Sequence, residues 1–333
     1  LARISGKQPG RTILLRGDID ALSVKEETGL PYASTNPGVM HACGHDCHIS
    51  MLLTAVHMIH DIQDQIKGTV VFAFQPAEEI GRGAQSMIAE GALEGVDACF
   101  GMHVWSDVAA GKVAMRKGAM MASGDRFKVK VIGKSGHGAQ PQRAVDAVVM
   151  GAAIVQNLQS LVSRELDPID TAVVTVGKFT GGTRFNVIAG TAELEGTTRA
   201  FNPEVRNSFA ERITRIAKST AEAMRGTAEV EYEYLVPVTI NDPKMIDVAA
   251  GAAKKIFGED GVLEAPQMMG GEDFSYYQEK IPGAMVLLGV RNEALGAVWP
   301  QHHGCYRVDE SVLVKGAALH VETALDFLGV ELH

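Results

Sequence analysis

The chain has 333 residues, of which 46% are hydrophobic and 21% charged, and its formal net charge is −9. This length allows two domains, each with its own core. The negative charge and the lack of basic runs with interleaved aromatic residues argue against a nucleic-acid partner, and no apolar run approaches a membrane span. Four cysteines are too few for a disulfide framework in a chain this long, so we expect a reducing compartment, the cytoplasm.

The first element that the pattern predicts is a buried strand at residues 12–15, which opens into a loop with Asp18 and Asp20. From Ile49 onward, apolar residues recur at helical spacing, so a helix with one buried face is expected there. The segment Met40–His48, MHACGHDCH, therefore lies at the N-terminus of that helix.

This segment holds three histidines, two cysteines and an aspartate around one glycine. If it is extended, Cys43 and His45 project to the same side, where a thiolate and an imidazole can share one ion. The helix N-terminus would also lower the pKa of Cys43 and favour its thiolate. The alternative is a helix start capped by Asp46, with cysteines buried as small apolar side chains. We interpret the segment as the first half of a metal site.

Two further buried strands are predicted at residues 69–74 and 98–102. Glu78 and Glu79 follow the first of these two strands, and His103 follows the second. In a parallel α/β sheet, ligands and catalytic groups gather beyond the carboxyl ends of the strands. The acids and histidines at these strand ends are therefore expected to share one active site.

From about Lys117 the pattern changes. Its predicted elements are a strand at 126–131, a helix at 144–162, strands at 172–179 and 191–199, a helix at 205–224 and a strand around 230–234. The order β-α-β-β-α-β is the split βαβ unit of ferredoxin-like domains. We therefore predict that residues 118–236 form an inserted α+β domain.

After Pro237 the pattern of the first domain returns. It consists of a helix at 242–257, a strand at 285–290, a loop with His302 and His303, and a last helix at 311–328. These elements complete a discontinuous α/β domain at residues 1–117 and 237–333. We expect it to be the metal-binding, catalytic domain, with a mostly parallel sheet and helices on both faces.

Eight short motifs run along the chain from Arg16 to Phe274. They are RGDIDAL at 16–22, MHACGHDCH at 40–48, PAEE at 76–79, GMHVW at 101–105, SGHGAQP at 135–141, FNVIAG from 185, GTTR ending at 199, and GGEDF at 270–274. As an ordered set they resemble the M20 metallopeptidases, in particular the amidohydrolase branch of hippurate hydrolases, N-acyl amino acid deacylases and auxin-conjugate hydrolases. The resemblance implies that the inserted domain acts as a lid and that two copies of the protein form a homodimer through this domain.

The resemblance also implies a centre of two divalent metal ions with Cys43 as the bridge. Its five ligands would be Cys43, His45, Glu79, His103 and His302. Thiolate, imidazole and carboxylate together suit Zn²⁺, Mn²⁺, Co²⁺ or Ni²⁺. Glu78 resembles the family's general base, and on an extended segment it would point away from Glu79 and reach the attacking water with a raised pKa. Asp20 matches an acid that orients a ligand, and His303 is the alternative to His302.

Three residues of the inserted domain resemble substrate-binding positions of the family. His137 matches a histidine that stabilises the oxyanion in the site of the neighbouring subunit. Asn186 and Arg199 match positions that bind the amino acid carboxylate. The alternatives are a solvated loop histidine, a strand-end amide and a surface charge. Asp18, Glu272 and Asp273 have no assigned catalytic role. Cys47 is expected to be a spectator near the metals rather than a site of oxidation, and His48, Cys99 and Cys305 are expected to be structural.

Together these features predict a cytoplasmic homodimeric amidohydrolase that cleaves N-acyl amino acids, hippurate-like or N-acetyl, with a metal-activated water and Glu78 as general base. The alternatives are an M20 dipeptidase or carboxypeptidase acting on short peptides, and a metal-dependent protein that binds amino acid conjugates without cleaving them. The family usually has an N-terminal helical segment, and this chain starts at Leu1 rather than methionine. Two alternatives are open: the native chain begins further upstream, or it lacks part of the cover over one face of the sheet.

Overall fold

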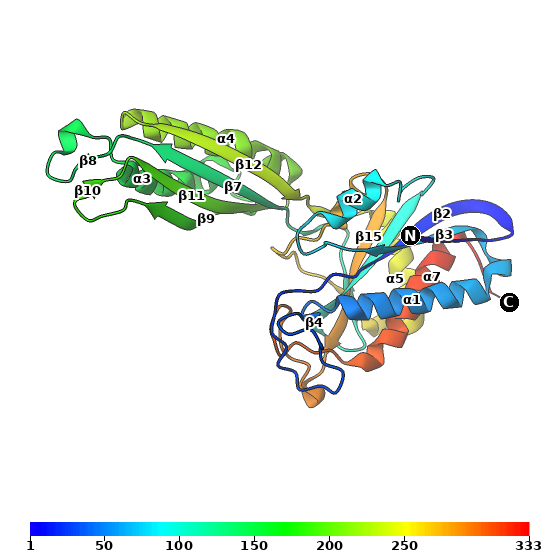
Figure 1. The fold of residues 1–333 in the computed structure, drawn as a ribbon. Coiled ribbons are helices and arrows are strands. Elements are labelled where there is room, and N and C mark those ends of the chain that lie inside the picture. The colour runs from blue at the N-terminus through cyan, green and yellow to red at the C-terminus, as the bar shows by residue number, and fades with distance from the viewer. Residues whose placement is uncertain (333) are drawn as a thin grey trace. The chain divides into compact units, whose positions relative to one another are not determined.

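The computed structural model describes residues 1–332, and these form two compact units (Figure 1). The first unit comprises residues 1–120, 239–267 and 272–332. The second comprises residues 121–238 together with the short segment 268–271. Each unit has a hydrophobic core of its own. The divisions at 120/121 and 238/239 lie close to the pattern changes near Lys117 and Pro237.

The first unit is built on a seven-stranded sheet in the order β1-β3-β2-β4-β15-β5-β14. The strands are β1 (Ala2–Ser5), β2 (Gln8–Asp18), β3 (Lys67–Gln75), β4 (Ala98–Ala109), β5 (Val113–Met115), β14 (Val262–Glu264) and β15 (Gly283–Arg291). The pairs β3–β2, β2–β4, β4–β15 and β5–β14 are parallel, whereas β1–β3 and β15–β5 are antiparallel. The sheet is therefore mostly parallel, as predicted.

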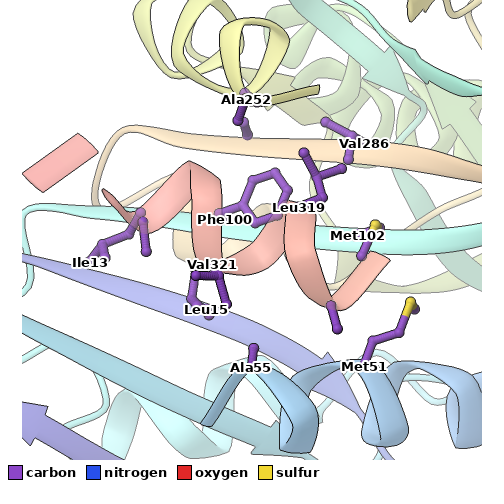
Figure 2. Packing of buried hydrophobic residues seen from close by; sticks show 14 of the residues in the cluster. Ile13, Leu15, Met51, Ala55, Phe100, Met102, Ala252, Val286, Leu319 and Val321 are labelled. Carbon is purple, nitrogen blue, oxygen red and sulfur yellow. The ribbon is translucent and has the colours of Figure 1, made fainter. Parts of the chain in front are cut away.

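One face of this sheet is covered by three long helices, α1 (His45–Asp61), α5 (Pro243–Phe257) and α7 (Leu313–Leu328). Buried side chains from the helices meet buried side chains from β2, β4 and β15, and bury most of the apolar surface of the unit. Figure 2 shows this packing for Ile13, Leu15, Met51, Ala55, Phe100, Met102, Ala252, Val286, Leu319 and Val321. Among the described residues, no helix has the length and apolar character needed to cross a membrane.

The opposite face carries the shorter helices α2 (Gly83–Ala89) and α6 (Ser275–Gln278). Side chains alternate along a strand, so Gly101 faces away from the core side that Phe100 and Met102 occupy. A Cβ atom at Gly101 would lie 3.0 Å from the ring of Phe274, which shows that the α6 segment packs closely on this face. Helices on both faces of a mostly parallel sheet confirm the predicted fold class.

The second unit has a four-stranded antiparallel sheet in the order β12-β7-β11-β9. Its elements are β7 (Gly124–Ile132), β8 (Gly136–His137), α3 (Ala147–Ser160), β9 (Ala172–Gly181), β10 (Val187–Ile188), β11 (Thr191–Ala200), α4 (Pro203–Ala223) and β12 (Thr227–Val236). Asp146 and Asn202 cap α3 and α4 by accepting backbone N–H groups of the first turn. The chain order and the strand order define the predicted split βαβ domain.

Candidate metal centre

The loop that carries the Cys43 motif turns sharply before α1. Gly44 has φ 85°, in the left-handed region, and α1 begins at the next residue, His45. A Cβ atom at Gly44 would lie 2.4 Å from a methyl carbon of Val104, so both the conformation and the close approach require glycine. The prediction of an extended Cys43–His45 segment was therefore wrong, because the helix starts at His45.

The turn nevertheless brings the five predicted ligands together in two groups. Cys43, His45 and His103 form one group, and Cys43, Glu79 and His302 form the other; within each group the ligand atoms lie within 4.8 Å of one another. The Cys43 sulfur lies 3.4 Å from Nε2 of His103. Because Cys43 belongs to both groups, its sulfur is placed where it can bridge two ions.

The histidines of the first group are oriented by hydrogen bonds of their Nδ1 atoms. Nδ1 of His45 lies 2.9 Å from the carbonyl oxygen of Asp20, and Nδ1 of His103 lies 2.6 Å from that of Val104. A carbonyl oxygen only accepts, so both Nδ1 atoms carry the proton and both Nε2 atoms are free to bind a metal. Asp20 also accepts the backbone N–H of Glu79 at 3.0 Å, so it fixes two ligands.

The unpaired polar atoms of this cluster fit a bound cation. Nε2 of His45 and Oε1 of Glu79 lie 3.9 Å apart, and both are buried and lack a hydrogen-bond partner among residues 1–332. Buried polar atoms are almost always paired, so orphaned atoms that converge on one place indicate a ligand. Sulfur, nitrogen and oxygen donors together suit a divalent transition metal better than Mg²⁺ or Ca²⁺.

The pKa of the Cys43 thiol differs from the expectation. Burial, followed by the charges of Glu79 and Glu78, raises this pKa, whereas the sequence led us to expect a lowered one. In the first turn of α1, the N–H groups of Cys47 and His48 donate to the carbonyl of Gly44. A bound metal ion would supply the charge that deprotonates the thiol.

Glu78 and Glu79 do not lie on the predicted extended segment and do not point to opposite sides. Ala77 has φ 61°, and the carbonyl of Glu78 accepts the N–H of Gly81, so the two acids lie in a turn after β3. Glu79 lies with Cys43 and His302, whereas Glu78 lies within 4.8 Å of His45 and Glu79 on one side and of Glu272 and Asp273 on the other. Burial and these carboxylates raise the pKa of Glu78, as predicted for the general base.

A buried arginine holds the acids next to Glu78, and sequence reasoning missed it. Arg16 is fully buried at the end of β2. Its guanidinium contacts Asp18 at 2.6 Å, Asp273 at 2.9 Å, Glu272 at 3.0 Å and Oε1 of Gln75 at 3.0 Å. Burial raises the pKa of Glu272 to about 7 despite this arginine. The signal in the sequence was a charged residue directly after an apolar run and before two acids.

The structure distinguishes the two adjacent histidines of the last loop. His302 has φ 66°, donates its backbone N–H to Ala42 at 2.7 Å, and places Nε2 3.5 Å from a carboxylate oxygen of Glu79. The ring of His303 instead stacks on Trp299 at 4.3 Å between centroids, and its Nδ1 accepts the N–H of Cys305. His302 is therefore the one that joins the ligand cluster.

Two of the three substrate-binding candidates lie together in the second unit. His137 on β8 pairs with Val187 on β10, and the N–H of Gly138 donates to the carbonyl of Asn186 at 2.9 Å. Nδ1 of the exposed His137 accepts the N–H of Ala139, so a neutral ring carries its proton on Nε2. This proton is available to a substrate oxygen.

Arg199 lies at the opposite end of the same sheet. β8 follows Ile132 and β10 precedes Thr191, and these two residues pair at one end of the sheet; Arg199 follows Thr198, which pairs with Asp125 at the other end. At roughly 3.3 Å per residue, the two ends are about 23 Å apart. Within one copy of this unit, His137 and Arg199 are therefore too far apart to contact the same small substrate.

The chain matches known proteins along nearly its whole length. Residues 14–326 match the peptidase family M20/M25/M40. N-acetyl-L-cysteine deacetylase of Bacillus subtilis (strain 168) is 39% identical over 97% of this chain and 76% of that protein. Thermostable carboxypeptidase 1 of Saccharolobus solfataricus is 38% identical over 98% of this chain and 83% of that protein.

A similar solved structure is that of the YXEP protein of Bacillus subtilis, described as a dinuclear metal-binding peptidase from the M20 family. It has a TM-score of 0.86 and 35% identity, over 99% of this chain and 85% of that one. The chain thus belongs to the M20/M25/M40 peptidase family, which confirms the resemblance seen in its motifs. It is a hydrolase that acts on amide bonds.

Proposed function

We propose that this protein is a metal-dependent amidohydrolase that releases amino acids from N-acyl amino acids. One observation carries the proposal: two ligand groups share the Cys43 sulfur, and a further carboxylate, Glu78, lies within 4.8 Å of His45 and Glu79 but outside both of these groups. A purely structural metal site closes its coordination with protein ligands and needs no such acid. The deacetylase relative, 39% identical, supports this substrate class.

Cys43, His45 and His103 would hold one divalent ion, and Cys43, Glu79 and His302 the other. Bound there, the ions would polarise the amide carbonyl and lower the pKa of a water molecule. The donor set favours Zn²⁺, Mn²⁺, Co²⁺ or Ni²⁺. Asp20 keeps His45 and Glu79 in position, through its carbonyl and its carboxylate respectively.

Glu78 would act as the general base and then as the general acid. Its carboxylate takes the proton of the attacking water as the new C–O bond forms, and returns it to the amide nitrogen as the C–N bond breaks. The nearby carboxyl groups of Glu272 and Asp273 oppose its negative charge, which makes protonation easier. Arg16 keeps these acids in fixed positions.

His137 would donate its Nε2 proton to the carbonyl oxygen, where negative charge develops during attack. Arg199 would bind the carboxylate of the amino acid. Its Nη1 is held by Thr197 Oγ1 at 2.5 Å and by the carbonyl of Thr198 at 2.8 Å, which fixes the plane of the guanidinium. Asn186, beside His137, would add a hydrogen bond to the substrate.

The positions of these residues in the second unit support the proposal of a homodimer. If one substrate contacts both Arg199 and His137, two copies must contribute, because the two residues lie at opposite ends of one sheet. The second unit would then serve as the dimerisation domain. All four cysteines, which lie within the described residues, are free thiols, and this supports a reducing compartment.

Glu78→Gln tests the assigned base. This change keeps the size of the side chain but removes the carboxylate, so turnover of N-acyl amino acids should fall by a factor of about 10² to 10⁴. Two metal ions per chain should still bind, because the five proposed ligands are unchanged. Glu90→Gln, an exposed glutamate in the same unit, serves as the control. Full turnover in the Glu78→Gln variant would exclude this residue as the base.

The second candidate function is a carboxypeptidase or dipeptidase, and the carboxypeptidase relative, 38% identical, favours it. The two activities differ in the substrate's amino end, because an N-acyl amino acid has no free ammonium group. We expect N-acetyl and N-benzoyl amino acids to be cleaved faster than dipeptides that carry the same C-terminal residue. The reverse order would favour the peptidase, and binding without cleavage would favour a binding protein.

A further inference from the structure

His48 lies one turn after His45 on α1 and contacts the rings of both imidazole ligands of the first group. Its ring is stacked with that of His45 at 5.4 Å between centroids and meets that of His103 edge to face at 4.7 Å. His48 is 1% exposed. By distance alone it could be counted as a ligand, since Asp18, His45 and His48 also form a group within 4.8 Å.

Its hydrogen bonds exclude that role. The backbone N–H of Val104 donates to Nε2 of His48 at 2.9 Å, so Nε2 must be the acceptor. The proton of the neutral ring is then on Nδ1, which donates it to a carboxylate oxygen of Asp18. Both ring nitrogens are therefore used, and neither has a free lone pair for a metal.

Val104 connects His48 to the metal ligands. Its carbonyl accepts Nδ1–H of His103 at 2.6 Å and Nε2–H of Gln301, the residue before His302, at 3.0 Å. Pairing of β2 with β4 ends at Gly101, so His48 satisfies the N–H of Val104 beyond the end of that ladder. Without His48, this buried donor would lose its partner and the backbone that orients His103 would lose a restraint.

Asp18 and Arg16 hold the other side of His48. Asp18 is fully buried, and its second oxygen accepts Nη1–H of Arg16 at 2.6 Å and lies 3.5 Å from Nε2 of His45. Arg16 is fixed in turn by Glu272 and Asp273. A continuous chain of hydrogen bonds thus runs from Arg16 through Asp18 and His48 to the backbone next to His103.

We propose that His48 is a positioning residue for one of the two ions, the one assigned to Cys43, His45 and His103, and that it binds no metal itself. It fixes the backbone beside His103 and packs against the ring of His45. Different groups position the ligands of the other ion. Asp20 accepts the backbone N–H of Glu79, and the carbonyl of Ala42 accepts that of His302. The inference rests on the metal centre of the proposed function but not on the reaction.

The test measures metal binding without substrate. Wild-type protein and the His48→Phe and His48→Gln variants are stripped of metal and titrated with Zn²⁺ against a competing chelator. In His48→Phe the affinity for one ion should fall about 10- to 100-fold, with a smaller change for the other. His48→Gln should recover part of the loss, because its amide oxygen can accept the N–H of Val104. Co²⁺ spectra should keep the thiolate charge-transfer band, since Cys43 is intact.

His320→Leu is the matched control, because His320 is also 1% exposed in this unit but belongs to neither ligand group. It should bind both ions as wild type does. A folded His48 variant with two ions of unchanged affinity would overturn the proposal, as would an equal loss in His320→Leu. If His48→Phe does not fold, His48→Gln and Asp18→Asn decide by the same measurement. A wild-type protein that binds no Zn²⁺ would overturn the metal centre and this inference together.

Discussion

At the scale of single residues, the chemistry of the site was more predictable than its geometry. Cysteine, histidine and glutamate in family order pointed to the five side chains that the structure brings together around Cys43. The backbone was not predictable, because the left-handed conformations of Gly44 and Ala77 break the extended geometry that spacing arguments assumed. Arg16 was missed because periodicity does not show which charged residue becomes buried by pairing with acids.

The two histidines of the last loop allow a direct test of the ligand set. Changes outside the ligand shell lower metal affinity roughly 10- to 100-fold. His302→Ala removes a proposed ligand, so it should lower the affinity for one of the two ions by more than that. His303→Ala should leave both affinities near wild type, since its ring packs on Trp299 instead. Metal content at buffered free Zn²⁺ measures both. If only the His303 variant loses an ion, His303 is the ligand and His302 is not.

At the scale of elements, long periodic segments were predicted well and their ends poorly. The helical spacing seen from Ile49 belongs to α1, but the helix itself runs from His45 to Asp61. The apolar pattern continues beyond Asp61 through Ile62 and Ile66, which lead into β3, so periodicity could not mark where the helix stops. The short strand β1 was missed because its four residues carry too little pattern.

The helix α7 contains a buried titratable group away from the ligands, His320. Burial, with a small contribution from His48, lowers the pKa of His320 to about 3. The ring therefore stays neutral in the folded state but is protonated below about pH 6.5 in the unfolded state. Its contribution to stability is present above that pH and is lost as the pH falls from about 6.5 towards 3, by about 1.4 kcal/mol per pH unit.

His320→Leu should remove this part of the acid sensitivity. The quantity compared is the fall in the free energy of unfolding between pH 7 and pH 5. In the metal-free variant this fall should be about 2 kcal/mol smaller than in the metal-free wild type. Urea denaturation at the two pH values gives the difference. His57→Leu, an exposed histidine on α1, is the comparison and should behave like wild type. Equal pH dependence in wild type and His320→Leu would show that His320 does not stay neutral.

At the scale of the whole molecule, the order of elements was sufficient to predict the fold class. Buried strands alternating with helices gave the mostly parallel sheet, and the β-α-β-β-α-β order gave the inserted domain. No local pattern could show that His137 and Arg199 lie at opposite ends of one sheet, because this depends on strand pairing. That separation is the main structural argument for a dimeric site, which remains a prediction.

Mixing two inactive variants tests whether the site needs two copies. Glu78→Gln lacks the base and His137→Ala lacks the proposed oxyanion donor, so each alone should be nearly inactive. If His137 acts in the site of the other copy, each mixed dimer has one complete site, and an equal mixture should recover about a quarter of wild-type activity. The variants are mixed under conditions that exchange subunits. No recovery, with mixed dimers shown to be present, would place His137 and Glu78 in one copy.

The most direct test of the central claim is the hydrolysis of N-acetyl and N-benzoyl amino acids by metal-stripped protein, before and after addition of Mn²⁺, Zn²⁺, Co²⁺ or Ni²⁺. Because the ligand groups share Cys43, we predict that turnover is absent without metal and appears with at least one of these ions as binding approaches two per chain. Undiminished hydrolysis by the metal-free protein would contradict the account. So would binding of two ions per chain with no cleavage of any amide tested.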